Sequence, residues 1–332
     1  MSSTPTAPAP EAVAKPKRRI NLGFDRFSGI YVWVALIIVF SIWIPQLFFT
    51  LDNVRAILSY QAISTVLALG LIVPVAAGAF DLTIAGTLTV SACFTAWALL
   101  AHKGVWIACG GALIIGAIIG LANATVVVKF KVDSFIGTLG MSSILVAIAY
   151  MITGGGQLVL PQAGYYPFLD FARQTWFGIS ASVYYAAVIA VVIWWVLEYT
   201  PGGRYLYAVG GNPVAARLAG VKVGRIITLS FVASAVVAAF AGILLLSTTS
   251  LGAPDIGANY LLPAFTAVFL GATQIRPGRV NVVGTIVAIL LLATGVDGLQ
   301  LAGFPTYVTQ LFNGLALIVA MALAVRSARR RG

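Results

Sequence analysis

The chain has 332 residues, of which 60% are hydrophobic and only 9% are charged, and its net charge is +11. Soluble domains carry about 25% charged residues, so this composition excludes an ordinary soluble protein and indicates an integral membrane protein. Lys and Arg cluster at both termini and in a few short loops, without a basic groove that carries interleaved aromatic residues. Nucleic acid is therefore not an expected partner.

The N-terminal residues 1–28 are polar and basic, and we expect a disordered cytoplasmic tail there. The first apolar run, Ile30 to Phe49, is longer than the apolar region of a signal peptide, and no small-residue cleavage site follows it. We therefore expect this run to be retained as the first membrane helix.

Apolar runs of about 20 residues recur along the rest of the chain, which is the length that crosses a bilayer as a helix. They predict an all-α membrane protein, a polytopic bundle of about ten transmembrane helices over residues 29–325. A short basic cytoplasmic tail follows over residues 326–332. The predicted spans are 29–49, 54–77, 82–101, 104–128, 134–153, 176–198, 226–249, 259–273, 280–298 and 304–325.

The placement of basic residues predicts the orientation of these spans. Cytoplasmic loops carry an excess of Lys and Arg. With the N-terminus in the cytoplasm, only Arg55, Lys103 and Arg173 of the 20 Lys and Arg residues fall outside. We therefore expect a multi-pass protein of the cell (inner or cytoplasmic) membrane, with both termini and the loop 200–225 in the cytoplasm.

The loop 200–225 is the one long polar and basic stretch inside the apolar part of the chain. Gly210-Gly211 suits a sharp turn, Asn212 an N-cap, Pro213 the first helical position and Gly220 the left-handed residue after a helix end. These residues predict a helix of about two turns, which is marginal in water unless it lies against a partner. Either it is a docking helix, or it is a surface turn between two spans. Its residues are Asn212, Pro213, Val214, Ala215, Ala216, Arg217, Leu218 and Gly220.

Asp81 is an acidic residue between two apolar runs, close to Pro74 and Gly78, which weaken the end of the second span. A charge at the bilayer centre costs about 2.5–3.5 kcal/mol, so we expect Asp81 near an interface or facing a cavity. It could cap the third span, or it could mark a broken helix beside a transport path, and the two roles are compatible. Candidates for that path are Asp81, Thr83, Gln61 and Asn123, although each could instead bond a neighbouring helix.

Catalytic and metal-binding signals are missing from the sequence. No Gly-Lys dipeptide occurs, so there is no Walker A loop for a nucleotide. Cys93 and Cys109 lie in apolar runs and are expected to be small buried side chains, and His102 is expected in a loop. We therefore expect no cofactor, no metal and no catalytic residue, and any ATP hydrolysis would take place on another chain.

Several stretches resemble one family of membrane proteins. The string GRYLYAVGGNPVAARLAGV, residues 203–221, is similar to the form found in monosaccharide (ribose/xylose-type) permeases of ABC importers. Within it, residues 214–220 resemble the E-A-A-x-x-x-G loop of importer permeases, with Val214 in place of Glu. Residues 81–83, 133–141 and 260–285 resemble further motifs of the same family, and the resemblance extends from about Leu51 to the C-terminus.

This resemblance implies the membrane subunit of an ABC importer for a small sugar, such as a pentose, a hexose or a related polyol. A separate ATPase would dock on residues 212–220, an extracytoplasmic binding protein would deliver the sugar, and a second, identical permease copy would complete the path. Replacing Ala216 by Arg is expected to uncouple ATP hydrolysis from uptake. The alternatives are an ABC permease for branched-chain amino acids or nucleosides, and an ion-coupled secondary transporter that uses Asp81.

Overall fold

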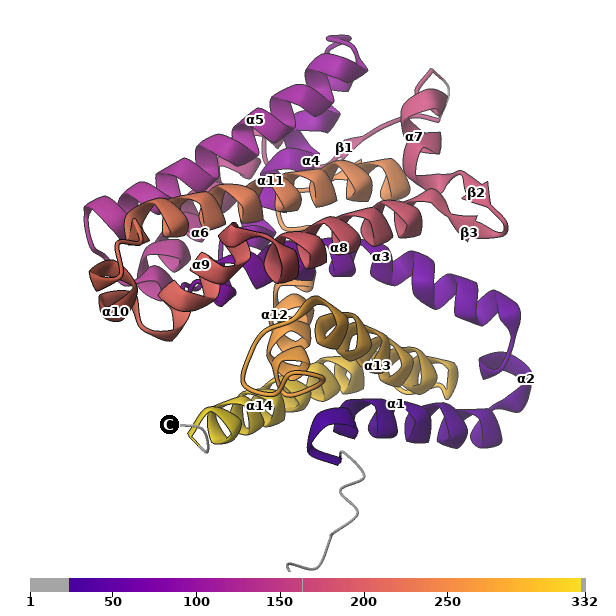
Figure 1. The fold of residues 1–332 in the computed structure, drawn as a ribbon. Helices are drawn as coiled ribbons and strands as arrows, with labels where there is room; N and C mark the ends of the chain where they lie inside the picture. The colour runs from indigo at the N-terminus through magenta and orange to yellow at the C-terminus, as the bar shows by residue number, and fades with distance from the viewer. Residues whose placement is uncertain (1–23, 163, 330–332) are drawn as a thin grey trace, which may run out of the picture.

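The computed structural model of the chain describes residues 24–162 and 164–329. They form a bundle of helices with two small two-stranded antiparallel ladders (Figure 1). The helices are α1 (Phe24–Trp43), α2 (Pro45–Phe48), α3 (Leu51–Ala76), α4 (Ile84–Leu100), α5 (Val105–Ala124), the π-helical η1 (Thr125–Lys129), α6 (Ser134–Thr153), α7 (Tyr166–Arg173), α8 (Ala181–Tyr199), α9 (Pro201–Gly211), α10 (Pro213–Leu218), α11 (Val223–Thr249), α12 (Ala258–Ala272), α13 (Val282–Leu301) and α14 (Thr306–Arg329). The strands are β1 (Leu158–Val159), β2 (Thr175–Trp176), β3 (Ile179–Ser180) and β4 (Leu251–Gly252).

Six of the described helices are long and apolar enough to cross a membrane, and four shorter helices are also apolar. The outer surface of the bundle carries many large apolar side chains, for example Ile144, Met151 and Val188, which are more than half exposed. In a bilayer these side chains face lipid rather than water. The structure therefore confirms the predicted class, an all-α polytopic membrane protein.

Helix α11 lies at the centre of the larger layer, where it packs against α3, α4 and α5. Gly116 and Gly120 of α5 allow a close approach: a Cβ atom at Gly120 would lie 2.6 Å from the Cα atom of Val232, and one at Gly116 would lie 2.6 Å from the Ala239 Cβ atom. This small-residue motif therefore serves packing within one chain.

A second layer contains α1, α13 and α14, and α12 joins the two layers. Figure 1 shows α12 running crosswise between the layer of α3, α8 and α11 and the layer of α1, α13 and α14. Helix α12 packs against α3 on one side and against α13 and α14 on the other. The Trp33 indole N–H donates to the Thr294 hydroxyl oxygen at 2.9 Å, which joins α1 to α13.

Both ends of the membrane domain differ from the sequence-based boundaries. Residues 24–28, expected in the N-terminal tail, belong to α1, and α14 continues to Arg329, into the expected C-terminal tail. The predicted first span, 29–49, is divided after Trp43, because Pro45 has no N–H with which to continue the helix. The rest of the two tails, residues 1–23 and 330–332, lies outside the described residues.

The sixth predicted span begins later than expected. The segment 176–198 was predicted as one helix, but α8 begins at Ala181 because Thr175–Ser180 form a hairpin. Its two central residues, Phe177 and Gly178, both have positive φ angles, 53° and 79°. This is the geometry of the two-residue turns that hairpins favour.

Candidate functional site

Helix α10 forms where the sequence predicted it, and its predicted end residues have the expected geometry. The Asn212 Oδ1 atom accepts hydrogen bonds from the backbone N–H groups of Val214 and Ala215, both at 3.0 Å. Pro213 is the first helical residue, and Gly220 has a φ of +84° after the helix ends. The helix is thus specified locally, at both ends, by its own sequence.

Helix α9 was not predicted, and the expected turn at Gly210-Gly211 is wrong. Both glycines belong to α9, whose first turn is capped by the Thr200 hydroxyl oxygen. A Cβ atom at Gly210 would lie 2.3 Å from the carbonyl oxygen of Ala76, at the end of α3. Glycine is therefore required for close packing rather than for a turn, and this need becomes visible only when α3 is in place.

The two faces of α10 differ in exposure. Ala216 is 6% exposed and packs in a small apolar cluster with Val209 and Val223. Val214 and Leu218 point away from this cluster and are 65% and 85% exposed. Helix α10 thus presents two apolar side chains on a short, capped support.

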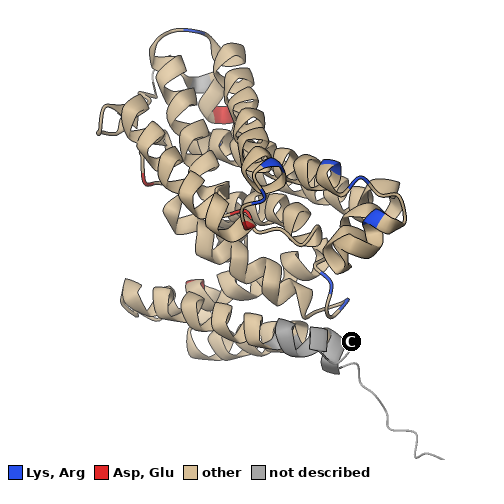
Figure 2. Ribbon diagram, turned by 90° about the vertical axis from the view of Figure 1, so that its left-hand side faces the viewer, with Lys and Arg blue, Asp and Glu red and all other residues tan. Residues whose placement is uncertain are grey.

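The end of the molecule that carries α10 is rich in basic residues. Figure 2 looks onto this side, and Lys and Arg are seen on its loops and short helices. Among the basic side chains that the structure describes, those at this end are Lys129, Lys131, Arg204, Arg217, Lys222, Arg225, Arg276 and Arg279, and those at the opposite end are Arg55, Lys103 and Arg173. The charge asymmetry predicted from the sequence is therefore also an asymmetry of the folded bundle.

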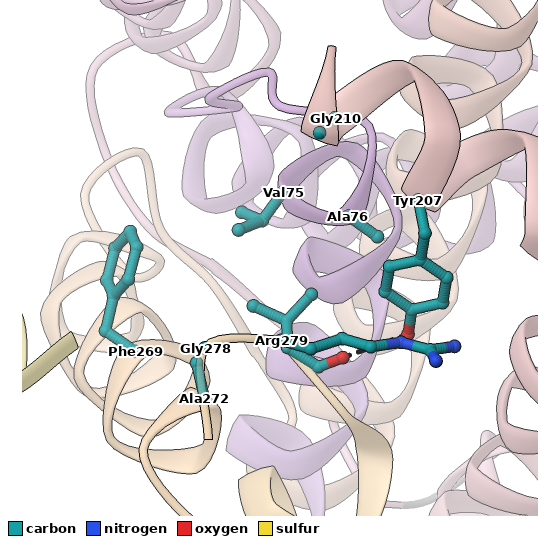
Figure 3. Close-up of a pocket in the computed structure, with 10 residues that line it drawn as sticks. Val75, Ala76, Tyr207, Gly210, Phe269, Ala272, Gly278 and Arg279 are labelled. Carbon is teal, nitrogen blue, oxygen red and sulfur yellow. Dashed lines mark hydrogen bonds between the residues drawn. The ribbon is translucent and has the colours of Figure 1, made fainter. Parts of the chain in front are cut away.

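A pocket of about 390 Å³ opens beside α9, between the end of α3 and the connection from α12 to α13. Figure 3 shows the residues that line it, with the Arg279 guanidinium beside the Tyr207 ring. The guanidinium carbon lies 3.5 Å from the ring centre, and the Tyr207 hydroxyl donates to the Val280 carbonyl oxygen at 2.9 Å. Burial raises the pKa of Tyr207, which favours the protonated hydroxyl that this hydrogen bond needs.

Glu198 adds a third element to this contact. At the end of α8, its carboxylate pairs with Arg276 and, at 3.7 Å, with Arg279. Glu198 is largely shielded from solvent, with 14% of its side chain exposed, so this pairing is less screened than at an open surface. The sequence did not single out Glu198, Tyr207 and Arg279 as a group, because Arg279 lies more than 70 residues after the other two.

Three of the four predicted pathway residues come together in one buried cluster. The Thr83 backbone N–H donates to the Asp81 Oδ1 atom, and the Ser234 hydroxyl donates to Oδ2 at 2.9 Å. The Asn123 amide donates to the Thr83 hydroxyl oxygen at 2.6 Å. Asp81, Thr83 and Asn123 are each 1% exposed or less.

This cluster joins the start of α4 to α5 and α11. Asp81 is not the N-cap of α4 as predicted: Thr83 occupies that position, and Asp81 accepts a hydrogen bond from the Thr83 backbone N–H. Thr138 and Ser134 of α6 hold the same loop through the Leu82 and Phe80 N–H groups. In these contacts, polar groups bond neighbouring helices, which was the alternative to a place in the transport path.

Gln61 lies elsewhere, in a cavity of about 370 Å³. The cavity is bounded by α3, α11, α12, α13 and α14, and it is nearer the end opposite to α10. Its polar lining residues are Tyr60, Gln61, Ser64, Thr249, Asn259, Tyr260 and Asn313. Of these the sequence singled out only Gln61 as a pathway residue, because nothing local sets Tyr60 and Ser64 of the same helix apart and the other four residues lie on other helices.

Comparison with known proteins identifies relatives for almost the whole chain. The family model described as "Branched-chain amino acid transport system / permease component" matches residues 53–321. The ribose import permease protein RbsC of Escherichia coli K12 is 29% identical over 300 residues, which is 89% of this chain and 92% of the relative. The L-arabinose permease AraH of Azospirillum brasilense is 28% identical over 319 residues, covering 95% and 93%. RbsC of Bacillus subtilis is 30% identical over 297 residues, covering 90% and 91%, and no solved structure matches the chain.

Proposed function

Because the chain belongs to the family of transport-system permease components, we propose that it is the membrane subunit of an ABC importer for a small neutral sugar. The relatives described above are named for ribose and L-arabinose, and they match over most of their length. As a permease component it moves the solute and is not itself an enzyme. ATP hydrolysis then belongs to a separate ATPase subunit, and an extracytoplasmic binding protein delivers the sugar. A second copy of the chain in the bilayer completes the path.

In this proposal the chain crosses the membrane ten times, with both termini in the cytoplasm. Helix α12 has 15 residues and is about 22 Å long, too short to cross the hydrocarbon core alone. The segment around it supports a crossing nevertheless. Ser250 contacts Arg173 at one end of the bundle, whereas Arg279 and Val280 contact Tyr207 at the other end. The extended residues before α12 and the crosswise helix together cover the distance.

Helix α10 is the ATPase-docking element in this proposal, and the observation that carries it is the pair of exposed side chains Val214 and Leu218. They project from a capped helix at the basic end of the bundle, the end that the positive-inside rule assigns to the cytoplasm. An apolar pair held rigidly in water favours a protein partner. Val214 stands where the resemblance has Glu, so this contact uses apolar burial instead of a charge.

The position of Ala216 in the structure makes Ala216→Arg unsuitable as a test of docking. Ala216 packs against Val209 and Val223, so Ala216→Arg would disturb the fold of the loop itself. Val214→Asp and Leu218→Asp place the change on the exposed face instead. We expect the double variant to reach the membrane in normal amount but to lose both the co-purified ATPase and sugar uptake.

Phe130→Asp is the matched control, because Phe130 is 65% exposed at the same end, like Val214. It should retain the ATPase. Recovery of a stoichiometric ATPase with the Val214→Asp/Leu218→Asp chain would refute docking through α10.

Branched-chain amino acids are the second candidate substrate, because the matching family model is named for them. Uptake of labelled D-ribose, L-arabinose and L-leucine into ATP-loaded membrane vesicles, with the co-purified partners present, separates the two. Uptake of L-leucine alone would replace the sugar assignment.

A further inference from the structure

The cavity around Gln61 has a lining of one chemical kind. Its polar side chains are amides and hydroxyls, and no Asp, Glu, Lys, Arg or His is among the residues that line it. Leu245, Ile256 and Leu292 supply apolar wall between them. A volume of about 370 Å³ falls within the range of small-molecule sites in proteins.

Thr249 uses its hydroxyl within the protein, where it donates to the Leu245 carbonyl oxygen at 2.7 Å, but five other polar residues of the cavity have no side-chain partner among the described residues. Within the described part of the chain, the side chains of Gln61, Asn259 and Asn313 form no hydrogen bond, and neither do the hydroxyl groups of Tyr60 and Tyr260. Elsewhere in the bundle, Asn53, Asn123, Asn212 and Asn281 each have a partner, whereas Gln274 is buried with neither polar atom of its amide bonded to a described residue. Tyr60 and Asn259 are exposed and Gln61, Tyr260 and Asn313 are half-buried, so their polar groups are available to a solute or to water in the cavity.

Helical spacing explains how α3 and α12 each present two residues to the cavity. Gln61 and Ser64 lie three residues apart on α3, and Asn259 and Pro263 lie four apart on α12, so each pair shares a helix face. Pro263 has no N–H and cannot donate to the Asn259 carbonyl, the regular helix acceptor four residues before it. The Asn259 position therefore offers a side-chain amide and also a backbone carbonyl without its usual donor.

We propose that this cavity is a binding site in the permease for a small, uncharged, polyhydroxylated solute, and that a monosaccharide occupies it during transport. The proposal rests on the importer function proposed above and deepens it by naming a site in this chain. The amides of Gln61, Asn259 and Asn313 both donate and accept, which matches hydroxyl groups that also do both. The ring faces of Tyr60 and Tyr260 offer apolar, electron-rich surfaces to the C–H groups of a sugar ring.

The same lining disfavours amino acids. A zwitterion would bring two charges into a cavity whose lining holds no charged side chain, and buried charges are costly unless they are paired. Water fills the polar positions when the site is empty, and sugar hydroxyls replace it without loss of hydrogen bonds.

Protection of introduced cysteines tests occupancy directly. The two native cysteines, Cys93 and Cys109, are free, and both are replaced by Ala in the starting chain. Asn259→Cys and Asn313→Cys are then made singly in full-length protein in lipid nanodiscs. Gln310→Cys is the matched control, because Gln310 lies on the same helix as Asn313 but does not line the cavity. A small thiol reagent is added with or without a mixture of D-ribose, L-arabinose and D-xylose.

We expect the sugar mixture to slow labelling at positions 259 and 313 and to leave position 310 unchanged, whereas L-leucine slows none of them. Unchanged labelling at both cavity positions would overturn the site. Slowing at position 310 as well would show a general effect of the solute, and would overturn it too.

Transport assays separate failure of the site from failure of the proposed function. Asn259→Leu and Gln61→Met keep the approximate side-chain size and remove one amide group each, so we expect the KM for sugar uptake to rise about fivefold for each. Gln310→Leu should leave KM unchanged. Normal KM in both cavity variants, together with ATP-dependent sugar uptake, would reject the site and keep the importer. Absence of any sugar uptake by the unaltered complex would reject the importer itself.

Discussion

The guanidinium carbon of Arg279, in the loop that joins α12 to α13, lies 3.5 Å from the centre of the Tyr207 ring. Tyr207 belongs to α9, which leads directly into α10, and Arg279 stands just before α13. Helices α12 and α13 also line the cavity around Gln61. This one contact therefore connects the helix proposed to dock the ATPase with two helices of the proposed sugar site.

Loss of this contact should impair transport more than assembly. A cation–π contact contributes from about 0.5 to about 2 kcal/mol, and Tyr207→Leu removes it together with the hydrogen bond to Val280. We expect Tyr207→Leu to retain the co-purified ATPase but to take up less sugar per ATP hydrolysed.

Tyr207→Phe is the graded control, because it keeps the ring and loses only the hydroxyl. It should lie between the unaltered chain and Tyr207→Leu in the ratio of uptake to hydrolysis. An unchanged ratio in Tyr207→Leu would show that coupling takes another route.

Close packing of α5 on α11 should make Gly120 intolerant of a larger side chain. In Gly120→Ala the new methyl group would meet the backbone of Val232 at 2.6 Å, so we expect a lower midpoint of thermal unfolding in detergent.

Gly110→Ala is the control on the same helix, since a Cβ atom there has no atom within 4 Å. It should be neutral or should stabilise by up to about 1 kcal/mol, because Ala favours helix more than Gly does. Equal unfolding midpoints for the two variants would contradict the packing described for α5 and α11.

The buried carboxyl of Asp81 should prove structural and not ion-coupling. Asp81→Ala leaves the Ser234 hydroxyl and the Thr83 N–H without their acceptor, and each buried unsatisfied group costs about 1–3 kcal/mol. We expect much less folded protein in the membrane from Asp81→Ala, and a smaller loss from Ser234→Ala.

Proton-gradient collapse supplies the complementary measurement. In vesicles supplied with ATP, an ionophore should leave sugar uptake by the unaltered complex unchanged. Uptake that disappears with the gradient while ATP remains would favour the secondary transporter.

The proposed orientation predicts which loops are accessible from outside the cell. In the chain without native cysteines, Lys103→Cys should react with a membrane-impermeant maleimide in whole cells. Lys131→Cys, in the loop before α6, should react only after the membrane is opened. The opposite pattern would invert the proposed topology.

Local signals explain which parts of the structure could be predicted from the chain. Asn212 caps α10 where it was expected, because a cap bonds backbone groups two or three residues away, and Asp133 caps α6 in the same way. Pro45 could have predicted the division of the first helix, but the span 29–49 was predicted from its continuous apolar character alone.

Other residues could not be placed without the fold. Gly210 was predicted to form a turn, but in the structure it lies in α9 and allows close packing against the Ala76 carbonyl. That carbonyl lies about 130 residues earlier in the chain, so the contact could not be predicted locally. Asp81 and Ser234 were both visible as polar residues between or within apolar runs, but nothing local indicates that they bond each other.

The sequence by itself determined the membrane class, the all-α character, the basic end and the capped α10, because hydropathy, charge and caps act over a few residues or a single span. Only the tertiary structure decided that Asp81, Thr83 and Asn123 form a closed cluster, while Gln61 joins Asn259 and Asn313 around an open cavity. Such groupings depend on which helix faces meet. Those contacts come from packing between distant segments, which no single stretch of the chain specifies.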